Sequence, residues 1–246
     1  MRMAITVAML LSFAKAAAQE NDSRGVTFSG NADIVSSYIW RGMREAGVSF
    51  QPSLTMEVAG FSVTAWGSAD FAGTSYREVD LSVAYLIGPV KISVLDAYCV
   101  DLKAERGLDG YGYFRYGKGS PHRVEAGIEW RISQRIPFTV AWYTTLTGGN
   151  DYDAEGKRTF ASYLELSYPF SVKGIDLNAG IGIVPWSAPG VYVVDNGFHV
   201  NDIFLKAGHT WSIENAGGMK IGLFTKASWN PALEDVNVMG GISVTM

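Results

Sequence analysis

The sequence predicts an all-β fold, a transmembrane up-and-down antiparallel β-barrel of about twelve strands. Three observations lead to this fold class. Polar and apolar residues alternate along successive segments, short and long connections alternate between these segments, and charged residues recur at the polar positions within them. Beyond the N-terminal region, no segment approaches the roughly 18 consecutive apolar residues of a membrane-spanning helix, so a helical membrane protein is excluded.

The alternation has the period of two that is typical of β-strands, in which successive side chains point to opposite faces. Val124, Ala126 and Ile128, for example, alternate with Glu125 and Glu129. The same pattern recurs along the chain and predicts twelve strands. They are expected at residues 26–41, 48–58, 61–71, 77–87, 90–100, 121–132, 137–147, 158–169, 174–184, 200–212, 219–229 and 236–246.

The connections between these segments alternate in length. Residues 59–60 and 88–89 leave room only for tight turns, whereas residues 101–120 and 185–199 form long loops. Short turns at one end and longer loops at the other are typical of outer-membrane barrels, whose short turns face the periplasm. A soluble β-sandwich or a propeller predicts no such rhythm, although it would also alternate, and a periplasmic sandwich is kept as the alternative fold.

Aromatic residues gather near the ends of the segments. The chain contains 7 Trp, 12 Tyr and 12 Phe, and membrane barrels carry girdles of aromatic residues at both interfaces. The alternative is that these residues form the core of a secreted sandwich. The residues concerned are Tyr38, Trp40, Trp66, Tyr85, Tyr98, Trp130, Trp142, Tyr168, Trp211 and Trp229.

The N-terminus has the features of a secretory signal peptide. Arg2 supplies a positive charge, residues 3–14 are mostly apolar, and Ala16 to Ala18 give a small-x-small cleavage pattern. We therefore expect a signal peptide at residues 1–18 and a single outer-membrane β-barrel domain at residues 19–246; the alternative is a buried N-terminal helix. The expected location is the outer membrane of a Gram-negative cell, with outer-membrane lipids and the barrel-assembly machinery as partners.

Composition excludes several classes of protein. A single cysteine, Cys99, rules out an intramolecular disulfide framework and a Cys-rich zinc module. A net charge of −4 argues against a nucleic-acid partner. No Gly-rich phosphate loop follows a predicted strand, so nucleotide binding has no support. We expect no cofactor and no metal site.

Charged residues recur on the side of the strands opposite to the apolar side. A Lys or Arg on the lipid-facing side near the middle of the bilayer would cost roughly 2–4 kcal/mol. We therefore expect these charges to line the lumen. The predicted pore-lining residues are Asp33, Arg41, Glu57, Asp70, Glu78, Asp80, Lys91, Glu125, Glu129, Arg131, Glu165, Asp176, Lys206, Lys220 and Lys226.

The predicted lumen charges are unevenly distributed. The third, fourth and sixth segments carry acidic residues such as Glu78 and Asp80, whereas the tenth and eleventh carry Lys206, Lys220 and Lys226. Opposed acidic and basic walls would set up a transverse field that orients dipolar solutes and tunes ion preference. The alternative is that the charges pair and fill the interior. Because twelve strands lie between a filled barrel and a wide channel, the sequence allows either a narrow pore or a plugged one.

One stretch of the chain resembles a known family. The segments SSYIWRG (36–42), SFQPSLT (49–55), GFSVTAWGSAD (60–70) and EVDLSVAY (78–85) are similar to the TorF family of outer-membrane porins, and VEAGIEW (124–130) resembles a later acidic strand of that family. The resemblance covers about a third of the chain. It implies a small outer-membrane barrel that conducts solutes, and it brings no catalytic residues.

Two loops contain residues that suggest ligands. Residues 110–118 combine aromatic and basic side chains, which could bind a sugar or a lipid phosphate; we favour a simple extension of the adjoining strands. Asp151, Asp153 and Glu155 resemble the start of a calcium-binding loop. Ser162 stands where such a loop has its last carboxylate, so a solvated acidic loop is expected instead.

An enzyme is the less favoured alternative. Outer-membrane lipid hydrolases use His with Ser, and a strand would place the two most simply as His-x-Ser, on one face. The residues two positions after His122, His199 and His209 are Val124, Asn201 and Trp211. None is serine, although a serine of a neighbouring strand, such as Ser228, stays possible.

The sequence therefore predicts a porin that is not an enzyme. Small hydrophilic solutes would pass by passive diffusion through a narrow, charged lumen. The main alternative is a structural or adhesive outer-membrane barrel that does not conduct.

Overall fold

The computed structural model describes residues 25–71, 76–101, 112–133, 135–195 and 197–246. The signal peptide predicted at residues 1–18 lies outside these residues, so it stays a prediction. Within the described ranges, no helix has both the length and the apolar composition needed to cross a bilayer.

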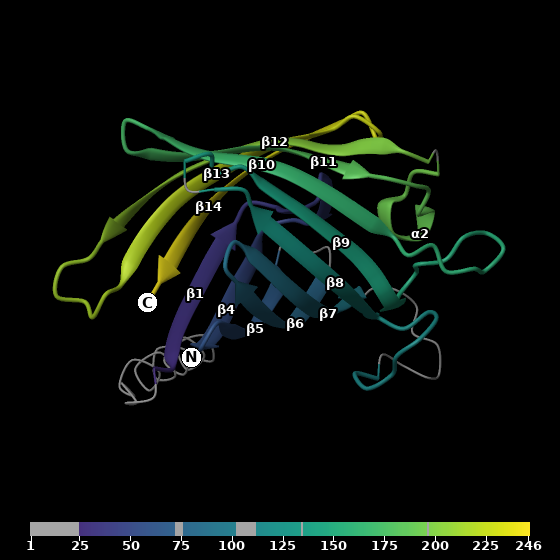
Figure 1. Cartoon of the computed structure of the whole chain (residues 1–246), viewed down its shortest axis with the longest axis horizontal. Coiled ribbons are helices and arrows are strands. Elements are labelled where there is room, and N and C mark those ends of the chain that lie inside the picture. Colours follow the sequence, from purple (N-terminus) through teal and green to yellow (C-terminus); the bar gives the residue numbers. More distant parts are fainter. Residues whose placement is uncertain (1–24, 72–75, 102–111, 134, 196) are drawn as a thin grey trace.

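Twelve strands form one closed antiparallel sheet, which confirms the predicted fold class (Figure 1). Strands that follow one another along the chain are neighbours in the sheet, and the pairing of β1 with β14 closes the barrel, so the topology is up-and-down. The barrel strands are β1 (Thr27–Val35), β4 (Ser49–Val58), β5 (Phe61–Asp70), β6 (Tyr76–Ile87), β7 (Val90–Asp101), β8 (His122–Arg131), β9 (Thr139–Gly148), β10 (Ser162–Val172), β11 (Ile175–Val184), β12 (His199–Ser212), β13 (Lys220–Asn230) and β14 (Asp235–Thr245).

The outward face of the barrel is apolar. Leu54, Leu81, Val94, Leu223 and Val238 are each 45–67% exposed. Side chains at the alternate positions of the same strands face the interior, which is the physical origin of the period of two in the sequence. Closure also gives every barrel strand two neighbours, so the backbone N–H and C=O groups pair within the sheet.

The first predicted strand, at residues 26–41, is too long, because β1 ends at Val35. The chain then leaves the barrel wall and forms a hairpin of β2 (Tyr38–Trp40) and β3 (Met43–Ala46), which pair only with each other. Arg41 and Gly42 form the tight turn of this hairpin, with φ angles of 47° and 82°. Two successive positive φ angles are typical of a type I′ turn, which reverses the chain within two residues.

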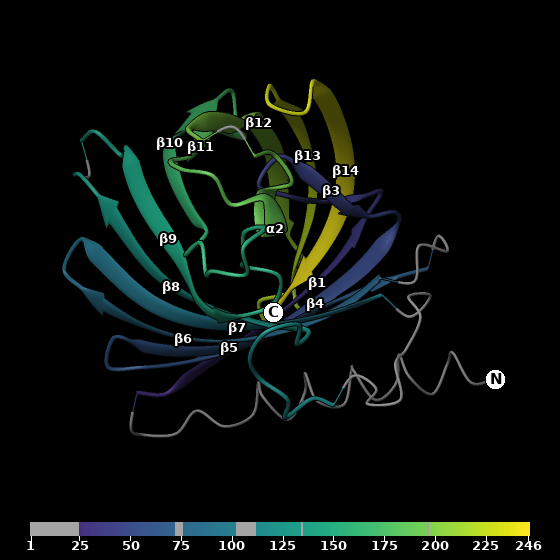
Figure 2. The same cartoon turned by 90° about the vertical axis from the view of Figure 1, so that its right-hand side faces the viewer.

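The eighth predicted strand, at residues 158–169, begins too early, since β10 spans Ser162–Val172. The residues before it are held in a loop instead. Asp151 accepts hydrogen bonds from the Thr159 hydroxyl and from the Ala161 backbone N–H, the latter at 2.9 Å. A short helix, α2 (Pro189–Tyr192), lies in the loop between β11 and β12, and Figure 2 shows it within the ring of strands.

Gly42 and Gly174 provide a matched test of how tightly the hairpin is packed. Both follow a residue with positive φ, and their own φ angles are 82° and 81°. A Cβ on Gly42 would overlap the carbonyl oxygen of Asn201, whereas a Cβ on Gly174 would have no atom within 4 Å. We expect Gly42→Ala to lower stability by roughly 1–3 kcal/mol more than Gly174→Ala, measured by thermal unfolding in detergent micelles. Equal losses in the two variants would show that the hairpin is free to move away.

Candidate functional site

The strand registers bring the predicted lumen residues onto one face of the barrel sheet. Directly paired residues share a face, as Lys91 and Glu129 do, and as Lys206 and Lys226 do. Apart from Arg41, in the hairpin turn, every predicted residue lies on a barrel strand. Asp33 is on β1, Glu57 on β4, Asp70 on β5, Glu78 and Asp80 on β6, Lys91 on β7, Glu125, Glu129 and Arg131 on β8, Glu165 on β10, Asp176 on β11, Lys206 on β12, and Lys220 and Lys226 on β13. That these residues line a conducting pore stays a prediction.

Arg41 connects the hairpin to the barrel wall. Its Nη1 donates to Glu125 Oε2 at 2.7 Å and its Nη2 donates to Glu125 Oε1 at 2.6 Å, which is a bidentate ion pair. Nη1 also donates to the hydroxyl oxygen of Tyr192 at 2.8 Å. The Arg41 and Glu125 side chains are only 11% and 4% exposed, so water screens this pair weakly.

Aromatic rings surround the Arg41 guanidinium. Its central carbon lies 4.6–4.7 Å from the ring centroids of Trp40, Tyr143 and Tyr163. The Trp40 ring also stacks on Tyr192, with centroids 5.7 Å apart and planes 1° from parallel. A cation over an aromatic face in a desolvated site gains about 2 kcal/mol or more. The rings therefore offset part of the cost of moving the guanidinium out of water.

The backbone of the hairpin turn is held from a different strand. Asn201, on β12, donates from Nδ2 to the carbonyl oxygen of Arg41 at 2.6 Å. Asn230, on β13, in turn donates to Asn201 Oδ1 at 3.2 Å, which orients the amide. Because β9, β10 and β11 separate β8 from β12, the turn bridges two distant parts of the wall.

A packed apolar cluster fills the loop end of the barrel. Its buried members come from the hairpin, from the ends of β10 and β11, and from the segment around α2, and Trp40, Tyr143 and Val191 pack against it. This end of the lumen is therefore occupied by the chain itself. The buried residues of the cluster are Met43, Ala161, Tyr163, Val184, Ala188 and Tyr192.

Several of the predicted wall charges have counter-ions on their own side of the barrel. Glu125 pairs with Arg41, as described above, and Lys91 Nζ lies 2.5 Å from Glu129 Oε1. Lys226 Nζ donates to Asp202 Oδ2 at 2.9 Å. Within the described residues, Lys206 and Lys220 form no ion pair, so the basic side keeps free charge on β12 and β13.

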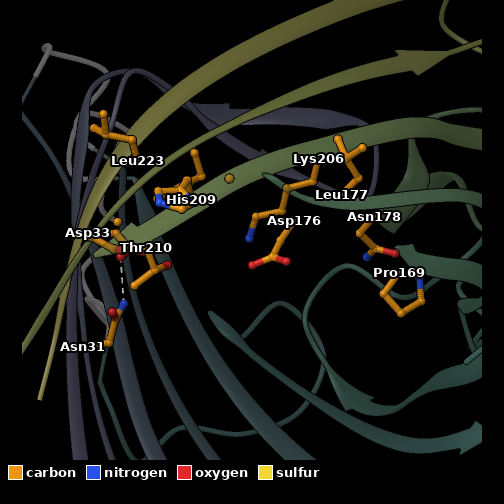
Figure 3. A pocket seen from close by; sticks show the side chains of 14 residues that line it. Asn31, Asp33, Pro169, Asp176, Leu177, Asn178, Lys206, His209, Thr210 and Leu223 are labelled. Carbon is orange, nitrogen blue, oxygen red and sulfur yellow. Dashed lines mark hydrogen bonds between the residues drawn. The ribbon is translucent and has the colours of Figure 1, made fainter. Parts of the chain in front are cut away.

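The turn end of the barrel contains a cavity of about 500 Å³ that is lined by both polar and apolar residues (Figure 3). It lies toward the opposite end of the lumen from the packed cluster, along the adjacent strands β10, β11, β12, β13, β14 and β1. Both signs of charge line it. Its lining includes Asn31, Asp33, Pro169, Asp176, Asn178, Lys206, Thr210, Phe224 and Ser243.

In the described part of the chain, no hydrogen bond joins any of the three histidines to a serine, as the nucleophile–base pair of a lipid hydrolase would require. His122 contacts Asp96 through Nδ1 at 2.8 Å and the Tyr113 carbonyl through Nε2. His199 and His209 each contact a backbone carbonyl through Nδ1, that of Gly197 and Gly174 respectively. The candidate partner Ser228 instead donates to Asp202 at 2.5 Å.

The segment after residue 111 does not extend β7 and β8 as expected. Residues 102–111 lie outside the described part of the chain, and residues 112–121 form turns and bends rather than strand. The Tyr116 hydroxyl donates to Asp96 Oδ2 at 2.7 Å, which fixes the segment against the outward face of β7. This hydrogen bond is the main reason why the pKa of Tyr116 rises to about 12.

The acidic loop at residues 151–156 is not simply solvated. Asp151 is fully buried, it is hydrogen-bonded within the loop, and its Oδ2 lies 3.5 Å from Arg158 Nη1. Asp153 accepts the Lys157 backbone N–H at 2.7 Å, so it closes the turn. Among the described residues, no group of three or more His, Cys, Asp or Glu side chains could hold a metal ion, which leaves the calcium interpretation without support.

Some residues of the site were not identified from the sequence. Asp202 and Phe204 lie four and two residues before Lys206 on the same strand. The period of two alone could therefore have placed both residues on the inward face with Lys206. No pattern in the sequence singles out Asn201 or Tyr192 in this way. Asn201 sits at an irregularity in the pairing of β11 and β12, and Tyr192 reaches Arg41 from a loop 151 residues further along the chain.

Solved structures that resemble this chain include outer-membrane porins and channels. A KdgM porin aligns with a TM-score of 0.43 and 6% identity, over 89% of this chain and 96% of that one. An outer membrane channel from Pseudomonas putida F1 aligns with a TM-score of 0.40 and 9% identity, over 89% of this chain and 94% of that one. The outer membrane protein OprD from Pseudomonas aeruginosa aligns with a TM-score of 0.35 and 11% identity, over 90% of this chain and 64% of that one.

No protein-family model and no curated protein matches the sequence. With TM-scores below 0.5, no function is inferred from these likenesses, and the resemblance to the TorF family stays a prediction.

The ion pair of Arg41 gives a test of the hairpin attachment. Arg41→Met leaves the buried Glu125 carboxylate without its partner, and breaking such a pair costs roughly 3–5 kcal/mol. Lys91→Met breaks the pair with Glu129, whose members are 43% and 27% exposed, and should cost about 1 kcal/mol or less. Thermal unfolding in micelles measures both losses. A double variant Arg41→Met/Glu125→Gln should recover part of the first loss, because no buried charge remains; equal small losses for both single variants would contradict this account.

Proposed function

We propose that the chain is an outer-membrane porin through which small hydrophilic solutes diffuse passively. The observation that carries the proposal is the combination of an apolar outward face and a charged inward face on one closed sheet. Large apolar side chains exposed around a barrel favour lipid as their surroundings, while ionised side chains inside require water. The predicted signal peptide and the resemblance to the TorF family agree with this function.

A barrel that does not conduct is the second candidate. The observation that favours it is the packed cluster at the loop end, where the hairpin and the α2 segment occupy the lumen. Such a barrel would act through its loops as a structural or adhesive protein. Among the described residues, no histidine–serine hydrogen bond supports a lipid hydrolase.

Single-channel recording separates the two candidates. The chain, purified from outer membranes and inserted into a planar bilayer, is expected to give discrete current steps that increase with salt concentration. The steps should be small, because chain segments narrow one end of the lumen. A correctly folded barrel, shown by circular dichroism and heat-modifiable electrophoretic mobility, that gives no steps would overturn the porin proposal in favour of the non-conducting barrel.

We also propose that the opposed acidic and basic walls set the ion preference of the pore. β6, which carries Glu78 and Asp80, lies six strands from β12, which carries Lys206, and is therefore opposite it in a ring of twelve. Because Glu125, Glu129 and Lys226 are ion-paired, fewer residues contribute to the transverse electric field across the lumen. Lys206, which lines the cavity, and Lys220 then carry the unpaired positive charge of the basic wall.

Reversing the charge of Lys206 tests this field. Lys206→Glu should shift the reversal potential in a KCl gradient toward cation selectivity, since the variant removes one positive charge and adds one negative charge inside the lumen. Lys173→Glu, in the β10–β11 turn, makes the same change in net charge outside the lumen and should leave the reversal potential nearly unchanged. Equal reversal potentials in Lys206→Glu and the unmodified chain would refute the field.

A further inference from the structure

We propose that the cavity at the turn end binds solutes that carry both a carboxylate and an ammonium group, namely amino acids and short peptides. The inference rests on the proposed porin function and adds a class of solute to it. Its basis is that one cation, Lys206, and two carboxylates, Asp33 and Asp176, line a single cavity of about 500 Å³ (Figure 3).

Lys206 is a cation that has no counter-ion among the described residues. It lies directly across from Lys226 in the β12–β13 pairing, and Lys226 is neutralised by Asp202 at 2.9 Å. Lys206 forms no ion pair within the described part of the chain; its Nζ lies 5.0 Å from the ring centroid of Phe224 instead. An ammonium has three donors, and an aromatic face does not neutralise its charge, so Lys206 retains the capacity to bind a carboxylate of a solute.

Asp33 and Asp176 supply the complementary charge. Asp33 accepts a hydrogen bond from Asn31 Nδ2 at 2.8 Å, and Asp176 accepts one from the Ser171 hydroxyl at 2.7 Å. In the described ranges neither carboxylate has a cationic partner, and each carboxylate can accept several hydrogen bonds. They lie on β1 and β11, on either side of the strand that carries Lys206, so a solute can face both signs of charge at once.

The remaining lining fits the neutral part of such a solute. Asn178, Thr210 and Ser243 offer amide and hydroxyl groups, which can hydrogen-bond to a peptide group. Phe224 and Pro169 offer apolar surface for a side chain. A purely anionic solute would meet two carboxylates here, and a purely cationic one would meet Lys206. The arrangement therefore favours a zwitterion over an ion of either sign.

Three dipeptide probes of nearly equal size test the inference. Glycylglycine is a zwitterion, N-acetylglycylglycine is an anion and glycylglycinamide is a cation at pH 7. Entry of each into proteoliposomes that contain the purified chain is followed by osmotic swelling, with a neutral sugar, arabinose, as the reference solute. Binding is measured separately by isothermal titration calorimetry in detergent. We expect glycylglycine to bind most tightly, and to enter faster than either charged analogue.

The outcomes separate this inference from the porin proposal. If arabinose enters but the three dipeptides bind and enter equally, the barrel conducts and the zwitterion inference is wrong. If no solute enters, the porin proposal fails, while calorimetry still reports whether the cavity prefers glycylglycine. Tighter binding of the anion or of the cation than of the zwitterion would also overturn the inference.

Variants then assign the binding to the cavity. Lys206→Met keeps an unbranched side chain against Phe224 but removes the charge, and it should weaken glycylglycine binding about tenfold, the factor expected when one charge-assisted contact is lost. Lys173→Met is the matched control, because Lys173 does not line this cavity.

Asp176→Asn should weaken the binding of both glycylglycine and glycylglycinamide, and it should leave the binding of N-acetylglycylglycine unchanged. Unchanged glycylglycine affinity in a folded Lys206→Met variant would place the binding elsewhere and refute the inference.

Discussion

The closure of the sheet is the constraint on which the rest of the structure depends. In a closed antiparallel sheet every strand pairs on both sides, so one parity of residues faces outward and the other faces inward all the way around. A slip of one residue would move the charges of a strand to the outward face, at a cost of roughly 2–4 kcal/mol for each Lys or Arg near the middle of a bilayer. Among the described barrel strands, the pairing is irregular at Val124/Glu125 and at Gly182/Ile183. Both positions lie near the loop end, so the alternation of inward and outward side chains persists through the rest of those strands.

The hairpin inside the barrel is held by its own buried charge. The Arg41 side chain is only 11% exposed, and a guanidinium in such surroundings needs a counter-ion and a full set of acceptors. Glu125 provides the first, and Tyr192 together with the surrounding rings completes the site. A buried ion pair is not by itself evidence of high stability, since desolvation opposes the attraction. Its main consequence here is that the bidentate contact fixes the position of the hairpin turn relative to β8.

The sequence predicted the barrel well and the hairpin not at all, for one physical reason. Strand alternation is a local property, and the inward positions could be assigned from it because each depends only on its neighbours in the chain. The residues before Arg41 also alternate, so local pattern continues the first strand to residue 41. β1 nevertheless ends at Val35, and Arg41 instead contacts Glu125, 84 residues away, which no local pattern reports. Two of the missed site residues show the difference. Asp202 alternates in step with Lys206 on the same strand, so the local pattern contains its position. Tyr192 lies in the loop between β11 and β12, whose conformation follows no repeating pattern.

Glycines on the inward face determine where the basic side chains lie. A Cβ on Gly180 would overlap the ring of Phe204, and a Cβ on Gly241 would overlap the ring of Phe224, so the absence of a side chain lets both rings lie close to the wall. Lys226 and Lys206 lie over these rings, at 4.8 and 5.0 Å from the centroids. The rings therefore position both ammonium groups without neutralising them. Of the two lysines, Asp202 forms an ion pair with Lys226. No ion pair within the described residues cancels the charge of Lys206, which therefore stays available within the cavity.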